Sequence, residues 1–333
     1  MMFYGNKDIL LLLKLSLENP INTYLFKGTK GVGKYTIALY LARRLLCHNN
    51  LKSCSCDSCI KVKSGNHPDL HIIVPDGNSI KVDQIRKLNE TTPMKPMLGQ
   101  RKIYLIDNAN LMTVESQNAL LKTIEEPNSF NIFILISHNN LLNTIESRSS
   151  IYEFKALSNN EISDFLSNFN LQQFQIELIT AACQGSVGVA KTLIEEKYFL
   201  SMENIIHRLF DFNNLNRLEI LNLFKLLKEK DKESFYDSNK DILIEFLYIF
   251  YTFFMDCIKV CMDDCKNLVF LSRKKDYVNI KDVFNIKYLH SIMQLIEEAI
   301  RKYADNRFNK NDFFKLITDI SVKSEEEGIW QID

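Results

Sequence analysis

A glycine-rich segment near the start of the chain has the composition of a phosphate-binding loop. Gly28, Gly31 and Gly33 precede Lys34; the apolar run TYLF stands directly before them, and the periodic segment IALYLARRLL follows. Glycines let backbone N–H groups close around phosphate oxygens at a helix N-terminus, where a lysine adds positive charge. A glycine turn that only begins a helix is the alternative, but both spacing and context favour descent from a phosphate-binding loop.

Two positions beside this loop depart from what hydrolysis of a bound nucleotide requires. Tyr35 follows the lysine, where a Ser or Thr hydroxyl would coordinate magnesium, and Thr36 would project about 100° further round the helix. KIYLID supplies Asp107 as a magnesium ligand, but Asn108 follows it, and an amide cannot accept a proton from water. The sequence therefore leaves binding of ATP or ADP open and predicts very slow or absent hydrolysis in cis.

Four of the eight cysteines fall in one short segment and suit a tetrahedral structural zinc site: Cys47, Cys54, Cys56 and Cys59. Reduced surface thiols are the alternative. The single residue between Cys54 and Cys56 narrows the chelate loop, so either the local geometry differs or one ligand drops out. His48 and His67 are nearby substitutes, although solvent-facing histidines are the simpler interpretation. Whether this shortened spacing binds zinc is not decided by sequence.

The remaining cysteines show no metal-binding pattern. Cys183 stands alone, whereas Cys257, Cys261 and Cys265 recur at i, i+4 and i+8, which predicts one face of a helix. Free cysteine packs as a small hydrophobe, and no fourth ligand is adjacent. We interpret these three as packing residues.

The elements that would position these residues change in type along the chain. Up to about Tyr152, short β-rich runs alternate with helical patterns, which predicts a parallel sheet with crossover helices; the runs are TYLF, LHIIV, KIYLID and NIFILIS. After Lys155 the pattern is helical, with breaks at 183–186 and 211–216. The apolar stretch at 242–257 is shorter than the roughly 20 residues of a membrane helix, so we expect a buried helix there.

Composition limits the function classes. A chain of 333 residues that is 46% hydrophobic can build two or three domains. Lysine plus arginine equals aspartate plus glutamate at 41 each, so no global positive field attracts DNA or a membrane. The first residues, MMFYGNKDILLLLKLSL, lack the layout of a secretory signal, and we expect a cytoplasmic protein.

Four further segments carry a family resemblance. NALLKTIEEP at 118–127 resembles a signature of the AAA+ clamp-loader subunits of bacterial DNA polymerase III, and Ser147-Arg148-Ser149 is similar to their Ser-Arg-Cys motif. His67-Pro68-Asp69 and the segment 80–86 resemble the connection that follows the zinc module of the family. The order and spacing of these blocks match over roughly residues 20 to 155.

This resemblance implies a fold and a domain organisation. Residues 1–155 would form an α/β P-loop AAA+ domain, a parallel sheet with flanking helices that carries the zinc module at 47–59. Residues 156–202 would form a small helical lid domain. Residues 203–333 would form an all-α collar through which the subunits oligomerise.

Departures from the family pattern indicate a class within it. Motor subunits of the gamma and tau type keep Ser or Thr after the lysine, a glutamate after the aspartate and an arginine after Gly-Ser-x. This chain has Tyr35, Asn108 and Gly188 instead, a combination that resembles the non-motor delta-prime class, the stator. The resemblance also implies that Arg148 is an arginine finger supplied in trans. A structural salt bridge at a helix start is the alternative role of this arginine.

The implied function is that of a stator in the DNA polymerase III clamp loader, which places the sliding clamp on primed DNA during replication. Its partners would be gamma or tau, delta, and through the complex the clamp and primed DNA, with no membrane. The chain would have no catalytic site of its own within this nucleotidyltransferase complex. One alternative is a divergent gamma-type ATPase; another is a stand-alone zinc-containing P-loop protein that binds nucleic acid. Subunit stoichiometry and contact surfaces are not readable from the sequence.

Overall fold

The computed structural model describes most of the first two thirds of the chain and parts of the rest: residues 3–47, 49, 54–196, 203, 240–278, 285–305, 307–308, 312, 315–316 and 318–320. The chain divides into two compact units, Met1–Leu157 and Ser158–Asp333. Each unit is considered by itself. The predicted lid–collar boundary at 202–203 and the predicted break at 211–216 involve residues outside the described ones.

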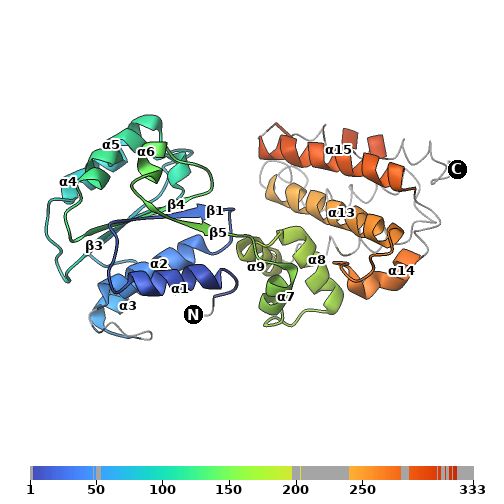
Figure 1. Ribbon diagram of the computed structural model, residues 1–333, viewed down its shortest axis with the longest axis horizontal. Coiled ribbons are helices and arrows are strands. Elements are labelled where there is room, and N and C mark those ends of the chain that lie inside the picture. The colour runs from blue at the N-terminus through green and yellow to red at the C-terminus, as the bar shows by residue number, and fades with distance from the viewer. Residues whose placement is uncertain are drawn as a thin grey trace. The chain divides into compact units, whose positions relative to one another are not determined.

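The first unit is built on a five-stranded, wholly parallel sheet (Figure 1). Its strands lie in the order β2-β3-β4-β1-β5, with bounds β1 Thr23–Gly28, β2 Leu70–Ile73, β3 Lys102–Ile106, β4 Asn131–Ser137 and β5 Ser150–Phe154. The four apolar runs of the sequence form the first four strands, so the predicted α/β class is confirmed. The fifth strand was not predicted as a separate run. Its sequence, SIYEF, places Ser150 and Glu153 among apolar residues, so β5 lacks a continuous apolar pattern.

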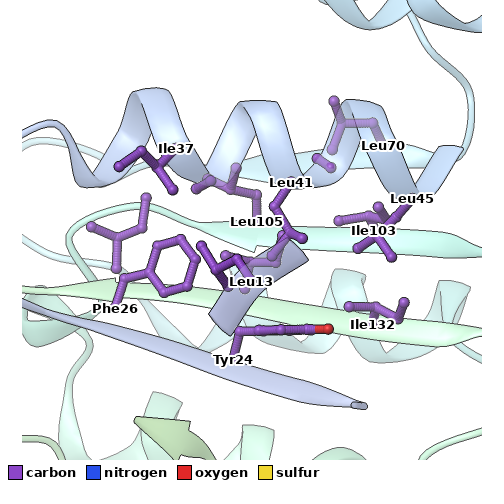
Figure 2. Close-up of a cluster of buried hydrophobic side chains, with 14 of the residues drawn as sticks. Leu13, Tyr24, Phe26, Ile37, Leu41, Leu45, Leu70, Ile103, Leu105 and Ile132 are labelled. Atoms are coloured by element: carbon purple, nitrogen blue, oxygen red, sulfur yellow. The ribbon is translucent and has the colours of Figure 1, made fainter. Parts of the chain in front are cut away.

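Helices cover both faces of this sheet: α1 Lys7–Ser16, α2 Lys34–Leu46, α3 Asp57–Lys63, α4 Val82–Thr91, the short η1 Ala109–Leu111, α5 Val114–Glu125 and α6 Asn143–Glu146. On one face, Tyr24 and Phe26 of β1 pack with Leu13 of α1 and Leu41 of α2 (Figure 2). Leu25 points to the opposite face, in the cluster formed with α4 and α5. Strands buried on both sides explain why their sequences are apolar almost throughout.

The regular elements in the described part of the second unit are all helices: α7 Asn159–Leu166, α8 Gln173–Cys183, α9 Val187–Glu196, α13 Lys240–Cys261, η3 Leu271–Arg273, α14 Lys274–Val278 and α15 Ile286–Ala304. The break between α8 and α9 is confirmed, since Gln184 and Gly185 both have positive φ there. The apolar stretch at 242–257 lies within α13, and its one acidic residue before Asp256, Glu245, is 7% exposed. Among the described residues, no helix is both long and apolar enough to cross a membrane.

One prediction for this unit is wrong. Cys257 and Cys261 lie on α13, but the helix ends at Cys261, so Cys265 does not continue the same helical face. Asp263 adopts a left-handed conformation with φ 65° immediately beyond the end. A backbone in that region cannot propagate an α-helix. The helix predicted from the i, i+4, i+8 spacing is therefore about one turn longer than the observed helix.

Candidate nucleotide and metal sites

The glycine-rich loop connects β1 to α2, as a phosphate-binding loop requires. Gly31 and Gly33 have φ of 81° and 92°, in the left-handed region that favours glycine. Gly28 has φ 140°, and a Cβ on it would lie 2.2 Å from the carbonyl oxygen of Phe154 on β5. The three glycines are therefore required by the backbone path itself, and Lys34 begins α2 directly after them.

Lys34 is held by groups of this chain. Its ammonium donates to the carbonyl oxygens of Gly28 at 2.6 Å and Thr29 at 2.5 Å, and its Nζ lies 3.0 Å from Nδ1 of His138. The side chain is buried, and this burial lowers the pKa of Lys34 to about 8, although the charge of Asp107 opposes the shift. An ammonium has three protons, and three acceptors surround this one.

Asp107 and Asn108 continue the same network. The backbone N–H of Asn108 donates to Oδ1 of Asp107 at 2.9 Å, and its side-chain amide donates to Oδ2 at 3.1 Å. The remaining amide oxygen of Asn108 lies 2.8 Å from Nε2 of His138. Since that oxygen can only accept, Nε2 of His138 carries the proton, and Nδ1 is left to accept from Lys34. Protein groups thus bridge the Asp107 carboxylate to the Lys34 ammonium.

Tyr35 and Thr36 occupy the first turn of α2. The Tyr35 side chain is 39% exposed; burial of the remainder raises the pKa of its phenol, and the charge of nearby Asp107 raises it further. Thr36 is half-buried. Tyr35 therefore places a phenol that senses the Asp107 charge at the position after the lysine, where a small hydroxyl would be required to hold magnesium.

His138 and Asn110 belong to this site although no sequence motif pointed to them. His138 is the first residue after β4, and its backbone N–H donates to Oδ1 of Asn110 at 3.1 Å. Strand β4 pairs in parallel with β1, with Ser137 opposite Lys27, so the residues that follow both strands meet at one sheet edge. The available signal was positional: a polar residue directly after a buried parallel strand lies at the edge where such sheets bind ligands.

Arg148 lies apart from this network, just beyond α6. Its guanidinium forms an ion pair with Glu125 at the end of α5, at 2.9 Å, and donates to the carbonyl oxygen of Thr144 at 3.1 Å. The two charged side chains are 40% and 44% exposed. The structure therefore contains a salt bridge, past a helix end rather than at a helix start, and on the surface, where such pairs contribute little stability.

The four N-terminal cysteines converge. The Sγ atoms of Cys47, Cys54, Cys56 and Cys59 all lie within 4.8 Å of one another. Cys47 follows α2, Cys54 and Cys56 precede α3, and Cys59 lies in its first turn, so the ends of two helices bring the four sulfur atoms together. Burial, followed by hydrogen bonds to the thiols of Cys47 and Cys56, raises the pKa of Cys59 to about 12. A bound metal ion would stabilise the thiolate forms of these clustered cysteines and so displace their protons.

The donor set fits a tetrahedral metal. Sulfur ligands about 2.3 Å from a zinc ion lie about 3.8 Å apart, so the observed cluster needs only small shifts to close on one. The one-residue link is accommodated, because the backbone N–H of Cys56 donates to Sγ of Cys54 at 3.4 Å and both thiols enter the cluster. His67 is used elsewhere: its Nε2 lies 2.9 Å from Oγ of Ser58, and its Nδ1 accepts from the N–H of Asp69 at 3.1 Å. His48 lies outside the described residues.

Comparison with known proteins addresses the first unit. Residues 7–158 match a family model described as DNA polymerase III, delta subunit. The delta-prime subunit of Bacillus subtilis is 44% identical over 117 residues, which cover 34% of this chain and 36% of that protein. The delta-prime subunit of Pseudomonas aeruginosa is 37% identical over 120 residues, 34% of this chain and 37% of that protein.

The first unit resembles DNA polymerase III delta-prime subunits. The tau subunit of Escherichia coli is also similar, 39% identical over 124 residues that cover 36% of this chain and 19% of tau. Among solved structures, a DNA polymerase III gamma-subunit-related protein of Thermotoga maritima is 18% identical, with a TM-score of 0.48 over 95% of this chain and 99% of that one. The matched sequence spans little more than a third of the delta-prime relatives' own length. The predicted delta-prime resemblance is confirmed over this region.

The glycine-rich loop of this delta-prime-like unit and the residue after Asp107 differ in what chemistry they can support. Its loop has the shape of a phosphate cradle, with the glycine conformations and the lysine in place. The residue after Asp107 is an amide that already bonds both oxygens of that carboxylate. Because an amide cannot take a proton from water, this position supplies no general base.

Proposed function

We propose that this chain is a non-motor subunit of a DNA polymerase III clamp loader, a stator of the delta-prime class. One observation carries the proposal: in a unit that resembles delta-prime subunits, Lys34 of the glycine-rich loop and the aspartate that follows β3 are joined through Asn108 and His138. Lys34 and Asp107, which would contact a nucleotide and its magnesium, are instead hydrogen-bonded to His138 and Asn108. Hydrolysis by the isolated chain is therefore not expected, and binding of ATP or ADP requires rearrangement.

The proposed partners are gamma or tau and delta, and through the complex the sliding clamp and primed DNA, in the cytoplasm. The delta-prime and tau relatives, named as subunits of DNA polymerase III, support this assignment. Residues 1–155 would be the AAA+ domain, 156–202 the lid and 203–333 the collar. The zinc module at 47–59 would hold one structural Zn²⁺ through Cys47, Cys54, Cys56 and Cys59, a proposal supported by the convergence of their sulfur atoms.

Arg148 would serve as an arginine finger toward a neighbouring subunit's nucleotide. Support comes from its exposure and from the nature of its present partner, since a half-exposed ion pair with Glu125 is weak and can be exchanged for phosphate oxygens. A planar guanidinium suits bidentate contact with phosphate. In this role the residue stabilises charge that develops on the transferred phosphoryl group.

Reconstitution tests the function and the finger together. Full-length chain is mixed with gamma or tau, delta, clamp and primed DNA, and ATP turnover and clamp loading are measured with wild type and with Arg148→Ala. We expect the variant to assemble but to lower DNA-stimulated turnover, because the site facing Arg148 would slow by about a thousandfold. Arg86→Ala is the matched control, since Arg86 also forms an exposed ion pair, with Asp83 at 3.1 Å. Unchanged turnover in Arg148→Ala would contradict the finger, and failure of the wild-type chain to assemble would contradict the function.

ATP turnover by the isolated chain distinguishes the stator from the gamma-type alternative. A motor subunit turns ATP over without partners, whereas a stator does not. We expect turnover of the purified chain to equal that of Lys34→Ala. Turnover clearly above this variant would favour the ATPase, and salt-dependent DNA binding by the isolated chain would favour the nucleic-acid-binding alternative.

A further inference from the structure

We propose that His138 keeps Lys34 away from phosphate, so that the phosphate-binding loop of this chain is closed by an internal ligand. Nδ1 of the ring lies 3.0 Å from Nζ of Lys34, opposite the two loop carbonyls that take the other protons of the ammonium. A phosphate oxygen can accept a hydrogen bond from the Lys34 ammonium only by displacing one of these three acceptors. The imidazole is the acceptor that does not belong to the loop.

Hydrogen bonds fix the position of His138 at two further points. Its Nε2 donates to Oδ1 of Asn108 at 2.8 Å, and its backbone N–H donates to Oδ1 of Asn110 at 3.1 Å. Asn108 is anchored in turn by two hydrogen bonds to Asp107. The ring is therefore held toward Lys34 rather than free to swing into solvent.

His138 and Asn108 connect Lys34 to Asp107, as phosphate and magnesium do in a site that holds a nucleotide. There a phosphate binds the lysine, and a metal joins that phosphate to the aspartate. Here two neutral side chains, His138 and Asn108, span from Lys34 to Asp107. Half-burial and the nearby charge of Lys34 lower the pKa of His138, which keeps the ring neutral and able to accept from the ammonium.

Binding of a fluorescent ADP derivative, N-methylanthraniloyl-ADP, to the full-length chain without magnesium tests the proposal. We expect His138→Ala to bind this probe at least about tenfold more tightly than wild type, because phosphate no longer competes with the imidazole for a charged donor. Adding Lys34→Ala to that variant should abolish the gain. His71→Ala is the matched control, since His71 is a partly buried histidine of the same sheet that stacks on Tyr104. Equal affinity in wild type and His138→Ala, or an equal gain in His71→Ala, would overturn the proposal.

A second variant tests the proposal independently, in case His138→Ala does not fold. Asn108→Gly removes the amide that orients the ring, and glycine tolerates the left-handed backbone at this position, where φ is 51°. We expect tighter probe binding here as well, with thermal unfolding close to that of wild type. Wild-type affinity in a folded Asn108→Gly would contradict the role of the anchored ring. The inference deepens the proposed function, but this assay uses the isolated chain, so its failure would be distinct from a failure of assembly or of the Arg148 test.

Discussion

At the scale of single residues, one amide changes the surroundings of a near-complete phosphate-loop motif. The glycines and Lys34 keep the geometry that phosphate requires, yet Asn108 changes both neighbours at once. An acid at this position would repel Asp107, whereas the amide bonds to it and presents an oxygen to His138. The amide thus supplies no general base at this position and also anchors the ring that contacts the lysine.

The cysteine cluster gives the prediction at this scale. We expect purified wild-type chain to contain about one zinc per molecule and Cys56→Ser to lose most of it, because a hydroxyl is a much poorer zinc ligand than a thiolate. Zinc displaces thiol protons, and the pKa of Cys59 without metal is raised to about 12, so affinity should fall as the pH is lowered. Elemental analysis and chelator competition at pH 6.5 and 8.0 measure both effects.

Cys265→Ser is the control for this measurement, since Cys265 is partly exposed and lies in the other unit. It should keep the zinc content of wild type. A wild-type chain that purifies without zinc, with all four N-terminal thiols freely reactive, would refute the site.

At the scale of elements, Gly28 shows how a loop residue can depend on a distant strand. Gly28 ends β1 and pairs with Phe154 of β5, and the space for a Cβ is taken by the carbonyl oxygen of Phe154. We expect Gly28→Ala to destabilise the β1–β5 pairing by more than about 3 kcal/mol, since backbone atoms must move. Gly33→Ala is the matched control: its φ is also positive, but no atom lies within 4 Å of the added carbon, so it should cost about 1–2 kcal/mol.

Hydrogen exchange of peptides that cover the two strands compares these variants locally, without requiring the whole chain to unfold in one step. Faster exchange of β1 and β5 in Gly28→Ala than in Gly33→Ala is the expected result. Equal protection in both variants would show that the edge strand yields easily to the added methyl group.

The elements also show what sequence patterns can and cannot predict. Buried parallel strands such as β3 and β4 are apolar at nearly every position, so their runs were recognisable. Strand β5 was missed because Ser150 and Glu153 interrupt its apolar residues, so it forms no continuous apolar run. His138 was missed because its role depends on which strands are neighbours, and one histidine after an apolar run carries no spacing signal. The end of α13 depends on the backbone of Asp263, which periodicity does not report.

At the scale of the whole molecule, the structure separates the delta-prime-like unit from a helical one. Within the second unit, α8 packs against α13, and Glu177 of α8 accepts hydrogen bonds from Ser272, including one from its backbone N–H at 2.9 Å. The region expected to be the lid is therefore joined to later helices by a buried carboxylate. Separating the expected lid from the later helices would break these hydrogen bonds.

This division leads to a prediction about assembly. A fragment of residues 1–157 should fold and retain zinc, because its sheet, both hydrophobic clusters and all four cysteines lie within it. A fragment of residues 158–333 should co-elute with gamma or tau and delta, because the proposed collar lies there. Size-exclusion chromatography of each fragment with those partners, beside zinc analysis, measures both expectations. If residues 1–157 assembled with the partners and 158–333 did not, oligomerisation would belong to the AAA+ unit and the collar assignment would be wrong.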